Sequence, residues 1–217
     1  MACKAVLYDM DGTVLNTLED LADAVNESLR RFSMPEVTED KVRRSIGNGA
    51  KKLIDRVVPE GTEPELTERV LAFYKPWYDT HCRVKTRPYP GIPELMGRLR
   101  RRGVKQAIIS NKPDPAVKEL ASFFFPGLLE TAVGESERVR VKPNPDAILA
   151  AAAEMGVALA DCVYVGDSEV DVLAAKNAGL RCVSVCWGFR GEEELKAAGA
   201  KHLAHDAGEL ERILEGM

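Results

Sequence analysis

The sequence predicts an α/β protein in which a doubly wound parallel sheet carries a small all-helical domain inserted after the first strand. Two observations lead to this class. From residue 92 onward, short apolar runs alternate with segments of helical periodicity, as in consecutive βαβ units. Residues 16–86 show helical periodicity alone. We therefore expect a core domain of residues 1–15 and 87–217 and a helical domain of residues 16–86.

The first strand is predicted at residues 5–8, where Ala-Val-Leu-Tyr forms an apolar run bounded by charge, as in a buried parallel strand. Apolar residues then recur at helical spacing from residue 17 to 32, and Met34-Pro35 ends that helix. Further helices of this block are expected at 38–46, 50–58 and 64–78. The stiff, turn-rich segment 87–91 marks the hinge back to the core domain.

Strands and helices alternate in the remainder of the chain. Strands are expected at 104–109, 131–133, 162–165, 181–185 and, at the edge, 202–204. Helices are expected at 92–102, 114–124, 145–155, 170–178 and 191–198, with one more at the C-terminus. Parallel strands joined by such crossovers end at the same edge of the sheet, which is where ligands bind in this class of fold.

Composition narrows the function. The 217 residues include 30 Lys and Arg against 34 Asp and Glu, a formal net charge of −4, with 6% aromatic residues. Nucleic-acid binding is therefore not expected. No apolar run approaches the ~20 residues that span a bilayer, and Asp9 and Asp11 come too early for a signal-peptide core. We expect a cytoplasmic protein without membrane partners, a monomer or a homodimer.

The cysteines show neither a disulfide pattern nor a zinc-binding one. They are five in number, widely spread and without a C-x-x-C pair: Cys3, Cys82, Cys162, Cys182 and Cys186. Disulfide frameworks and zinc sites usually need tighter, even patterns. We interpret these residues as small apolar side chains in a reducing compartment.

The first candidate motif is Asp9-Met10-Asp11-Gly12-Thr13, directly after the first strand. Carboxylates at i and i+2 of an extended chain point to the same side. At ~4 Å and an effective dielectric of about 20, their repulsion is roughly 4 kcal/mol, so the pair needs a cation or a proton. Mg²⁺ suits it, being held by carboxylates, water and substrate phosphate. The alternative is a surface turn, for which Asp-Gly-Thr is a common sequence.

The second motif is Gly166-Asp167-Ser168, followed by Asp171 one helical turn later. It indicates further metal ligands at the end of another buried strand. Alternatively, the acids compensate the dipole of the helix that begins there, which explains Asp171 well but a second strand-end acid less well. The two interpretations are compatible.

Two further motifs provide groups that bind anions. Ser110-Asn111 follows a strand and precedes a helix, where a hydroxyl and amides could hold a phosphate; an ordinary N-cap or turn is the alternative. In Lys142-Pro143-Asn144-Pro145, Pro145 fits the first helical position with Asn144 as the cap. Lys142 then lies at the positive end of a helix, which disfavours a cation unless an anion binds there. The alternative is a solvated loop lysine.

Asp, Ser-Asn, Lys and Asp at four strand ends, in this order, resemble the four motifs of the haloacid dehalogenase (HAD) superfamily. The likeness spans the chain, with D-x-D-G-T at 9–13, S-N at 110–111, K-P-x-P at 142–145 and G-D-S-x-x-D at 166–171. It implies a Rossmann-like core, and the block 16–86 resembles the family's helical cap. Residues 185–191 and Glu194-Leu195 are similar to the end of its phosphoglycolate phosphatase branch.

The resemblance also implies roles for single residues. Asp9 would be the nucleophile that forms an aspartyl-phosphate. Asp11 would protonate the leaving alcohol and then activate water, and its backbone carbonyl would bind Mg²⁺. The implied metal ligands are Asp9, Asp11 and Asp167, with Asp171 and Ser168 behind them.

Other residues are implied to bind the substrate. Ser110 and Lys142 would hold the phosphoryl oxygens, Lys142 acting also as a catalytic residue that neutralises Asp9. Asn111 would lie on the substrate side of the phosphate, and Thr13 would be a further substrate-binding residue. In the basic segment 43–52, the turn amides at Asn48 and Gly49 could hold the carboxylate of a small acid. The same segment could equally be an outward-facing charged helix surface.

The resemblance implies a Mg²⁺-dependent phosphatase acting on a small phosphorylated metabolite, with 2-phosphoglycolate as the best candidate. Asp11 favours phosphoryl transfer, because the superfamily's dehalogenases have no aspartate there. Lys51 and Lys52 are interpreted as solvated charges rather than as the cap lysine of the phosphonate-cleaving branch. A pyrophosphatase and a β-phosphoglucomutase are alternatives within the superfamily, and a phospho-aspartate switch protein is the alternative from another class.

Overall fold

The protein is represented by a computed structural model, in which residues 3–217 are described. Its contacts divide the chain after Leu15 and after Arg87 into a core unit and a helical unit of residues 16–87. The second division lies one residue from the boundary expected from the sequence. At the two crossings, β2 (Leu15–Asn16) and β3 (Arg87–Pro88) pair as a small two-stranded sheet.

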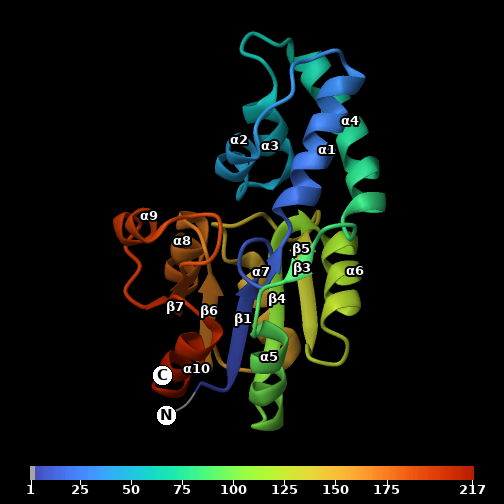
Figure 1. The fold of residues 1–217 in the computed structure, drawn as a ribbon. Helices are drawn as coiled ribbons and strands as arrows, with labels where there is room; N and C mark the ends of the chain where they lie inside the picture. The colour runs from blue at the N-terminus through green and yellow to red at the C-terminus, as the bar shows by residue number, and fades with distance from the viewer. Residues whose placement is uncertain (1–2) are drawn as a thin grey trace. The chain divides into compact units, whose positions relative to one another are not determined.

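The core unit is built on a six-stranded sheet with the order β5-β4-β1-β6-β7-β8. Every pairing in it is parallel, which confirms the predicted α/β class (Figure 1). The strands are β1 (Ala5–Asp9), β4 (Lys105–Pro113), β5 (Thr131–Glu135), β6 (Cys162–Gly166), β7 (Arg181–Val185) and β8 (Leu203–Ala204). The chain returns to the sheet on both sides of β1, so β1 is central.

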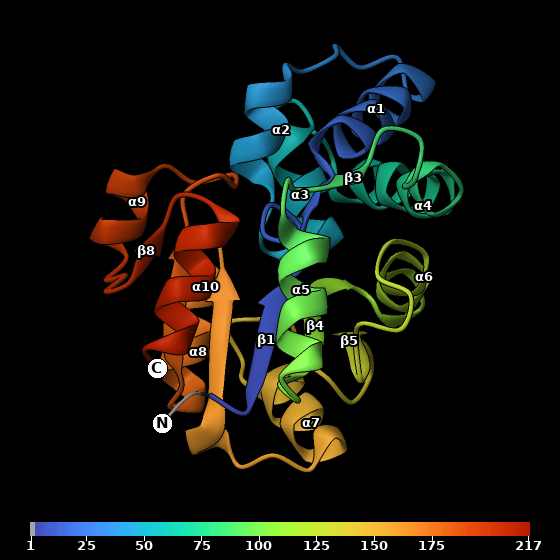
Figure 2. The ribbon, with the colours of Figure 1, turned by 60° about the horizontal axis from the view of Figure 1, so that its bottom comes forward.

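Helices cover both faces of this sheet, as a doubly wound fold requires (Figures 1 and 2). On one face, α7 and α8 share an apolar core with β1, β4 and β6 that contains Leu7, Ile109 and Ile148. On the other face, α5 and α10 contact each other. The helices of the unit are α5 (Ile92–Arg101), α6 (Asp114–Phe124), α7 (Asp146–Met155), α8 (Glu169–Ala178), α9 (Glu192–Ala197) and α10 (Ala207–Glu215), with a 3-10 turn at Leu159–Asp161.

The helical unit contains α1 (Leu18–Arg31), α2 (Glu39–Ser45), α3 (Gly49–Val57) and α4 (Pro64–His81). The apolar side of α1 is buried, and α1 packs against α4. The buried carboxylate of Asp20 accepts the backbone N–H groups of Lys85 and Thr86 at 2.8–3.1 Å, which ties the last segment of the unit to α1. Helix α4 runs three residues past the predicted end at residue 78, with Pro76 inside it.

Several predicted boundaries in the core unit differ from the structure, and two of the differences fall in or next to the sequence motifs. Strand β4 does not stop before Ser110 but continues to Pro113, with an irregular register between Ile109 and Pro113. Helix α7 begins at Asp146, so Pro145 is its N-cap rather than its first residue. The β4 extension is polar in sequence, and its side chains are buried against partners that are distant in the chain, which local periodicity does not reveal.

The structure also shows the state of the cysteines and the character of the helices. All five cysteines are free; Cys3, Cys82 and Cys162 are buried, and Cys182 and Cys186 are partly exposed. Within residues 3–217, no helix combines the length and apolar character needed to cross a membrane.

Substituting Leu7 by Ala should lower the free energy of unfolding by about 2–5 kcal/mol, because the side chain lies fully buried in the central strand. Leu149→Ala on α7 is the matched control: that side chain is 43% exposed, so its loss should change the free energy by no more than about 0.5 kcal/mol. Urea denaturation followed by circular dichroism measures both. Equal losses would contradict the assigned burial.

Candidate active site

The carboxyl ends of β1, β4 and β6 bring three of the sequence motifs to one edge of the sheet (Figure 1). The parallel register pairs Asp9 with Ile109 of β4 and Tyr8 with Val165 of β6. Ser110 therefore follows the partner of Asp9, and Asp167 follows the end of β6. The alternation of strands and helices in the sequence predicted that the motifs would meet at one edge of the sheet. The register of the strand pairs places them side by side there.

Three carboxylates meet there. Asp9, Asp167 and Asp171 each offer an oxygen atom within 4.8 Å of the others, and we call these residues the acidic cluster. Their exposed fractions are 8%, 1% and 0%. Asp9 and Asp167, which the motifs predicted to share one ion, are thus close together. Buried carboxylates this near to one another require compensating positive charge.

Lys142 supplies one positive charge to the acidic cluster. Its Nζ lies 2.7 Å from Asp9 Oδ1 and 2.7 Å from Asp171 Oδ1, and it donates to the hydroxyl of Tyr164 at 3.2 Å. Burial lowers the pKa of the Lys142 ammonium, but Asp171 and Asp9 outweigh burial, so the pKa lies well above its ordinary value. Both the contacts and the raised pKa thus favour the charged form of Lys142 inside the cluster.

Asn111 holds the backbone of Lys142 in place. Its Oδ1 accepts the backbone N–H of Lys142 at 2.6 Å, and its Nδ2 donates to the backbone carbonyl at 3.2 Å. The resemblance had assigned Asn111 to the substrate. In the structure, its amide holds the backbone of Lys142, which joins the second and third motifs, and the substrate role stays a prediction.

Asp171 serves two structural purposes at once. Its Oδ2 accepts the backbone N–H of Ser168 at 3.1 Å and the Ser168 hydroxyl at 2.6 Å, closing a capping box at the start of α8. Its Oδ1 meets Lys142 and accepts the hydroxyl of Tyr164 at 3.1 Å. Both interpretations of Asp171 drawn from the sequence, a helix-terminal acid and a member of the site, are therefore compatible with its contacts.

If all three were ionised, the carboxylates of the acidic cluster would carry more negative charge than Lys142 neutralises, and the pKa values of two of them are raised. Burial and then Asp171 raise the pKa of Asp167 to about 7, against the lowering effect of the Phe189 N–H and Thr13 hydroxyl bonds. Burial, followed by repulsion from Asp171, also raises the pKa of Asp9 in spite of Lys142. An oxygen-only site with excess negative charge suits a hard divalent cation.

Two glycines let the backbone approach Asp167. A Cβ at Gly12, where φ is +84°, would lie 2.3 Å from Asp167 Oδ2. A Cβ at Gly188 would lie 2.3 Å from Asp167 Cβ and 2.5 Å from the carbonyl oxygen of Gly12. Neither position has room for a side chain. The carboxylate is therefore enclosed by backbone from the ends of two different strands.

The segment 187–191, here called the β7–α9 loop, also contacts the site. Phe189 N–H donates to Asp167 Oδ2 at 2.7 Å, and Trp187 Nε1 donates to the backbone carbonyl of Thr13 at 3.0 Å. Thr13 in turn donates its hydroxyl to Asp167 Oδ1 at 3.0 Å. Reasoning from the sequence noted this loop as a family likeness but assigned it no contact. Thr13 is thus a hydrogen-bond partner of Asp167, and its predicted role in substrate binding stays a prediction.

Asp11 lies outside the acidic cluster. Both of its carboxylate oxygens accept from Lys112 Nζ at 2.7 Å, and both side chains are mostly buried. The three clustered side chains are thus Asp9, Asp167 and Asp171, whereas the predicted ligand set contained Asp11, through its backbone. Lys112 was not predicted. Its position directly after Ser-Asn in the second motif was the only local signal.

Ser110 is buried within β4, and its Oγ accepts the backbone N–H of Lys112 at 3.2 Å. The expectation that it lies at a helix N-terminus is wrong, because the strand runs on through Lys112 before α6 begins. The amides beside Ser110 belong to extended backbone. Whether its hydroxyl binds a phosphoryl group remains the prediction made from the motif.

Asn48 and Gly49 belong to the helical unit. Asn48 precedes α3, and its Oδ1 accepts from Arg56 Nη2 at 2.8 Å. Gly49 begins the helix with φ of +83°. The cations of segment 43–52 pair with acids of the same unit, Arg43 and Arg44 with Asp40, Lys51 with Glu68 and Lys52 with Asp55. A substrate-binding role for Asn48 and Gly49 stays a prediction.

Residues 6–185 match the haloacid dehalogenase-like hydrolase family, and the chain belongs to it. It is 36% identical over 193 residues to phosphoglycolate phosphatase 1 of Pseudomonas aeruginosa, covering 86% of this chain and 70% of that one. It is 29% identical over 225 residues to the N-acetylmuramic acid 6-phosphate phosphatase of the same species, covering 99% and 96%.

A solved structure shows the same fold over the whole length. The protein, from Lactobacillus delbrueckii subsp. bulgaricus, was provisionally described as a phosphoglycolate phosphatase. It superposes with a TM-score of 0.95 at 35% identity and full coverage of both chains. The resemblance inferred from four motifs is thus confirmed. The chain is an enzyme of the HAD-like hydrolases, and the relatives named here are phosphatases.

Substituting Asp167 by Asn should change how stability depends on pH in the metal-free protein. A carboxylate whose pKa rises from 3.8 to about 7 on folding retains its proton in the folded state, so the free energy of unfolding falls as the pH rises through this range. Asn has no such proton. The variant should therefore gain about 1–3 kcal/mol on the native protein between pH 5 and pH 7.5.

Urea denaturation in EDTA at the two pH values measures this difference. Asp161→Asn is the control, because that carboxylate forms a surface ion pair with Lys4, and its difference from the native protein should move by no more than about 0.5 kcal/mol. A pH-independent difference for Asp167→Asn would contradict the charge crowding described above.

Proposed function

We propose that this protein is a Mg²⁺-dependent phosphatase that hydrolyses a small phosphorylated carboxylic acid through an aspartyl-phosphate on Asp9, with 2-phosphoglycolate as the preferred substrate. One observation carries the proposal: Asp9 ends the central strand in contact with a buried ammonium and beside a second carboxylate, Asp167. This arrangement provides a nucleophile, a cation for the phosphoryl charge and ligands for a divalent ion.

Asp9 is held ready for attack on phosphorus. Its Oδ1 accepts the backbone N–H of Met10 at 2.7 Å and meets Lys142 at 2.7 Å. Because both contacts fall on Oδ1, we assign the attack to Oδ2. A bond from Oδ2 to phosphorus forms as the bond to the leaving oxygen breaks, and water then cleaves the acyl phosphate to return the carboxylate.

Lys142 stabilises the charge that moves in both steps. Its ammonium is already placed against Asp9 and is held there by Asp171, Tyr164 and the Asn111 clamp on its backbone. A preorganised cation of this kind lowers the barrier without reorganising during the reaction. Ser110 lies in β4, directly after the residue that pairs with Asp9. We assign its hydroxyl to the binding of a phosphoryl oxygen.

Mg²⁺ fits the oxygen donors of the acidic cluster. Asp9 and Asp167 would hold it, together with the backbone carbonyl of Asp11, and Asp171 would stay behind them on Lys142 and Ser168. Bound there, the ion would offset the repulsion between Asp9 and the incoming phosphate. The raised pKa of Asp167 and the tight glycine enclosure support this assignment.

Asp11 is the acid and base of the reaction. It would donate a proton to the leaving alkoxide and later take one from the attacking water. Its carboxylate points to Lys112 and stays out of the acidic cluster, which leaves it separate from the metal ligands. An acid at this position is what an alcohol leaving group requires.

The substrate class follows from Lys112 and from the relatives. Phosphoglycolate and N-acetylmuramic acid 6-phosphate each combine a phosphate monoester with a carboxylate, and enzymes named for each resemble this chain. Lys112 forms an ion pair with Asp11, the residue that would protonate the leaving group, and we assign its ammonium to the carboxylate of the substrate. We favour 2-phosphoglycolate, the smaller of the two acids, because this chain is more similar to the relative named for it, at 36% against 29% identity. A cytoplasmic location and a monomeric or homodimeric state remain expectations from the sequence.

The purified protein should release phosphate from 2-phosphoglycolate in Mg²⁺ and lose this activity in EDTA. Asp9→Asn should lower kcat on the order of 10³-fold or more, because the amide cannot form the acyl phosphate. Asp146→Asn, which weakens the contacts with Arg140 at the start of α7, should leave kcat within about twofold. Activity that survives in EDTA or in Asp9→Asn would refute the mechanism.

A substrate panel distinguishes the alternatives. Faster turnover of pyrophosphate, or conversion of β-glucose 1-phosphate to the 6-phosphate, would replace the proposed substrate class with that of a pyrophosphatase or a mutase. A phosphoprotein that persists after brief exposure to a phosphodonor, without steady release of phosphate, would indicate a switch protein.

Lys112→Gln should reduce kcat/KM for 2-phosphoglycolate about 10- to 100-fold more than for ethyl phosphate, which has a similar alcohol leaving group but no carboxylate. The lost interaction is a charge-assisted hydrogen bond, typically worth about 1.5–3 kcal/mol. Comparing the two substrates removes any effect that acts through Asp11. Lys118→Gln on α6, at the surface, is the control and should leave the ratio unchanged. An equal loss of kcat/KM for both substrates would show that Lys112 does not recognise the carboxylate.

A further inference from the structure

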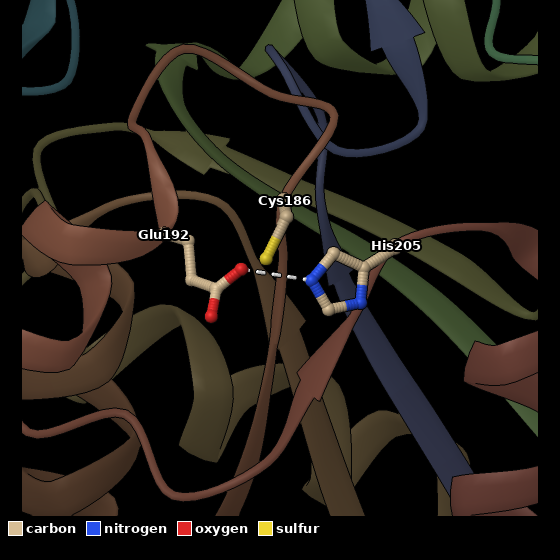
Figure 3. A group of neighbouring side chains, drawn as sticks. All are labelled: Cys186, Glu192 and His205. Atoms are coloured by element: carbon tan, nitrogen blue, oxygen red, sulfur yellow. Dashed lines mark hydrogen bonds and ion pairs between the residues drawn. The ribbon is translucent and has the colours of Figure 1, made fainter.

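A second group of potential metal ligands lies apart from the acidic cluster. Cys186, Glu192 and His205 each offer one ligand atom, and all of these atoms lie within 4.8 Å of one another. The three side chains converge from different segments of the core unit (Figure 3). Thiol, carboxylate and imidazole together are the donors of zinc sites, whereas magnesium sites use oxygen alone.

The fold fixes two of these residues through the sheet. Val185 at the end of β7 is paired with Ala204 at the end of β8, so Cys186 and His205 are the next residues of adjacent parallel strands. The backbone N–H of Cys186 donates to the carbonyl of Ala204 at 2.9 Å. Glu192 is the first residue of α9. The positions of the donor atoms therefore depend on regular backbone.

Glu209 orients the imidazole. Its Oε2 accepts from His205 Nδ1 at 2.9 Å and also from the backbone N–H of His205 at 2.9 Å. A carboxylate on one ring nitrogen is the usual arrangement behind a metal-bound histidine, because it fixes the tautomer and aims the other nitrogen. Here the other nitrogen, Nε2, faces Glu192 Oε2 at 3.0 Å.

We propose that Cys186, Glu192 and His205 form a second metal site, selective for Zn²⁺ over Mg²⁺, with water as the remaining ligand. Zinc replaces the proton on the Cys186 thiol and the proton shared by His205 Nε2 and Glu192, and both are released to solvent. Lys196 holds the other oxygen of Glu192 at 2.7 Å and leaves Oε2 directed at the site. Glu192 and His205 are 40% and 53% exposed in their side chains, so an ion can enter from solvent.

The position of this site gives it a structural effect. Cys186 and Glu192 flank the β7–α9 loop, whose Trp187 and Phe189 contact Thr13 and Asp167. Zinc would join both ends of the loop to β8 through His205. It would thereby restrain the backbone that encloses Asp167, which links this site to the catalytic edge without touching substrate.

Cobalt(II) tests the site because its spectrum reports a thiolate ligand, which the acidic cluster lacks. Co²⁺ is added to reduced, EDTA-treated protein in excess Mg²⁺. We expect a near-ultraviolet thiolate-to-cobalt band at one equivalent, bleached by Zn²⁺. Absence of the band, or its presence in Cys186→Ser, would overturn the proposal. Cys182→Ser is the matched control, a partly exposed cysteine within β7 that should keep the band.

Two variants separate ligation from orientation. His205→Asn should reduce Co²⁺ affinity and shift the visible bands, because the coordination sphere changes. Glu209→Gln should weaken binding about 10- to 100-fold while leaving the thiolate band in place. Unchanged affinity in both variants would contradict the assigned roles. Circular dichroism confirms that each variant is folded, and none of these readouts depends on phosphatase activity.

Discussion

The burial of three carboxylates around one ammonium is the constraint on which the rest of the core unit depends. Asp9, Asp167 and Asp171 come from two strand ends and one helix, and Lys142 is the cation placed among them. Each member would be costly to bury alone. Together they require the parallel register, the cap of α8 and the clamp by Asn111 to hold at the same time. The raised pKa values of Asp9 and Asp167 show that Lys142 does not offset the charge of all three carboxylates, so protons or a further cation must balance it.

The class of fold could be predicted because its signals are local. Apolar runs and helical periodicity lie within single segments, and the four motifs fall where those segments end. The β4 extension could not be foreseen in this way. Asn111 and Lys112 are poor strand formers, and they are buried only because Lys142 and Asp11 satisfy them from far along the chain. Tertiary contacts therefore override the low strand propensity of these two residues.

The same limit applies to the candidate site. The cap formed by Asp171 involves residues three apart, so it could be predicted from the sequence. The ion pair between Lys112 and Asp11 joins residues 101 positions apart, which no local pattern reveals. The close approach of Gly188 to Asp167 likewise arises from packing between two strand ends. Cys186, Glu192 and His205 have no short spacing, and the sequence argued against a zinc site for that reason. Strand pairing, rather than spacing, assembles them.

The hold of Asn111 on Lys142 has a consequence for how the chain can vary. Because both backbone polar groups of Lys142 are secured by a side chain of β4, the ammonium is located from the sheet and not from the segment that leads to it. The exposed residues 136–138 between β5 and Lys142 could thus vary without displacing the charge. The conformation of the connection between β5 and Lys142 therefore does not determine where the buried ammonium lies.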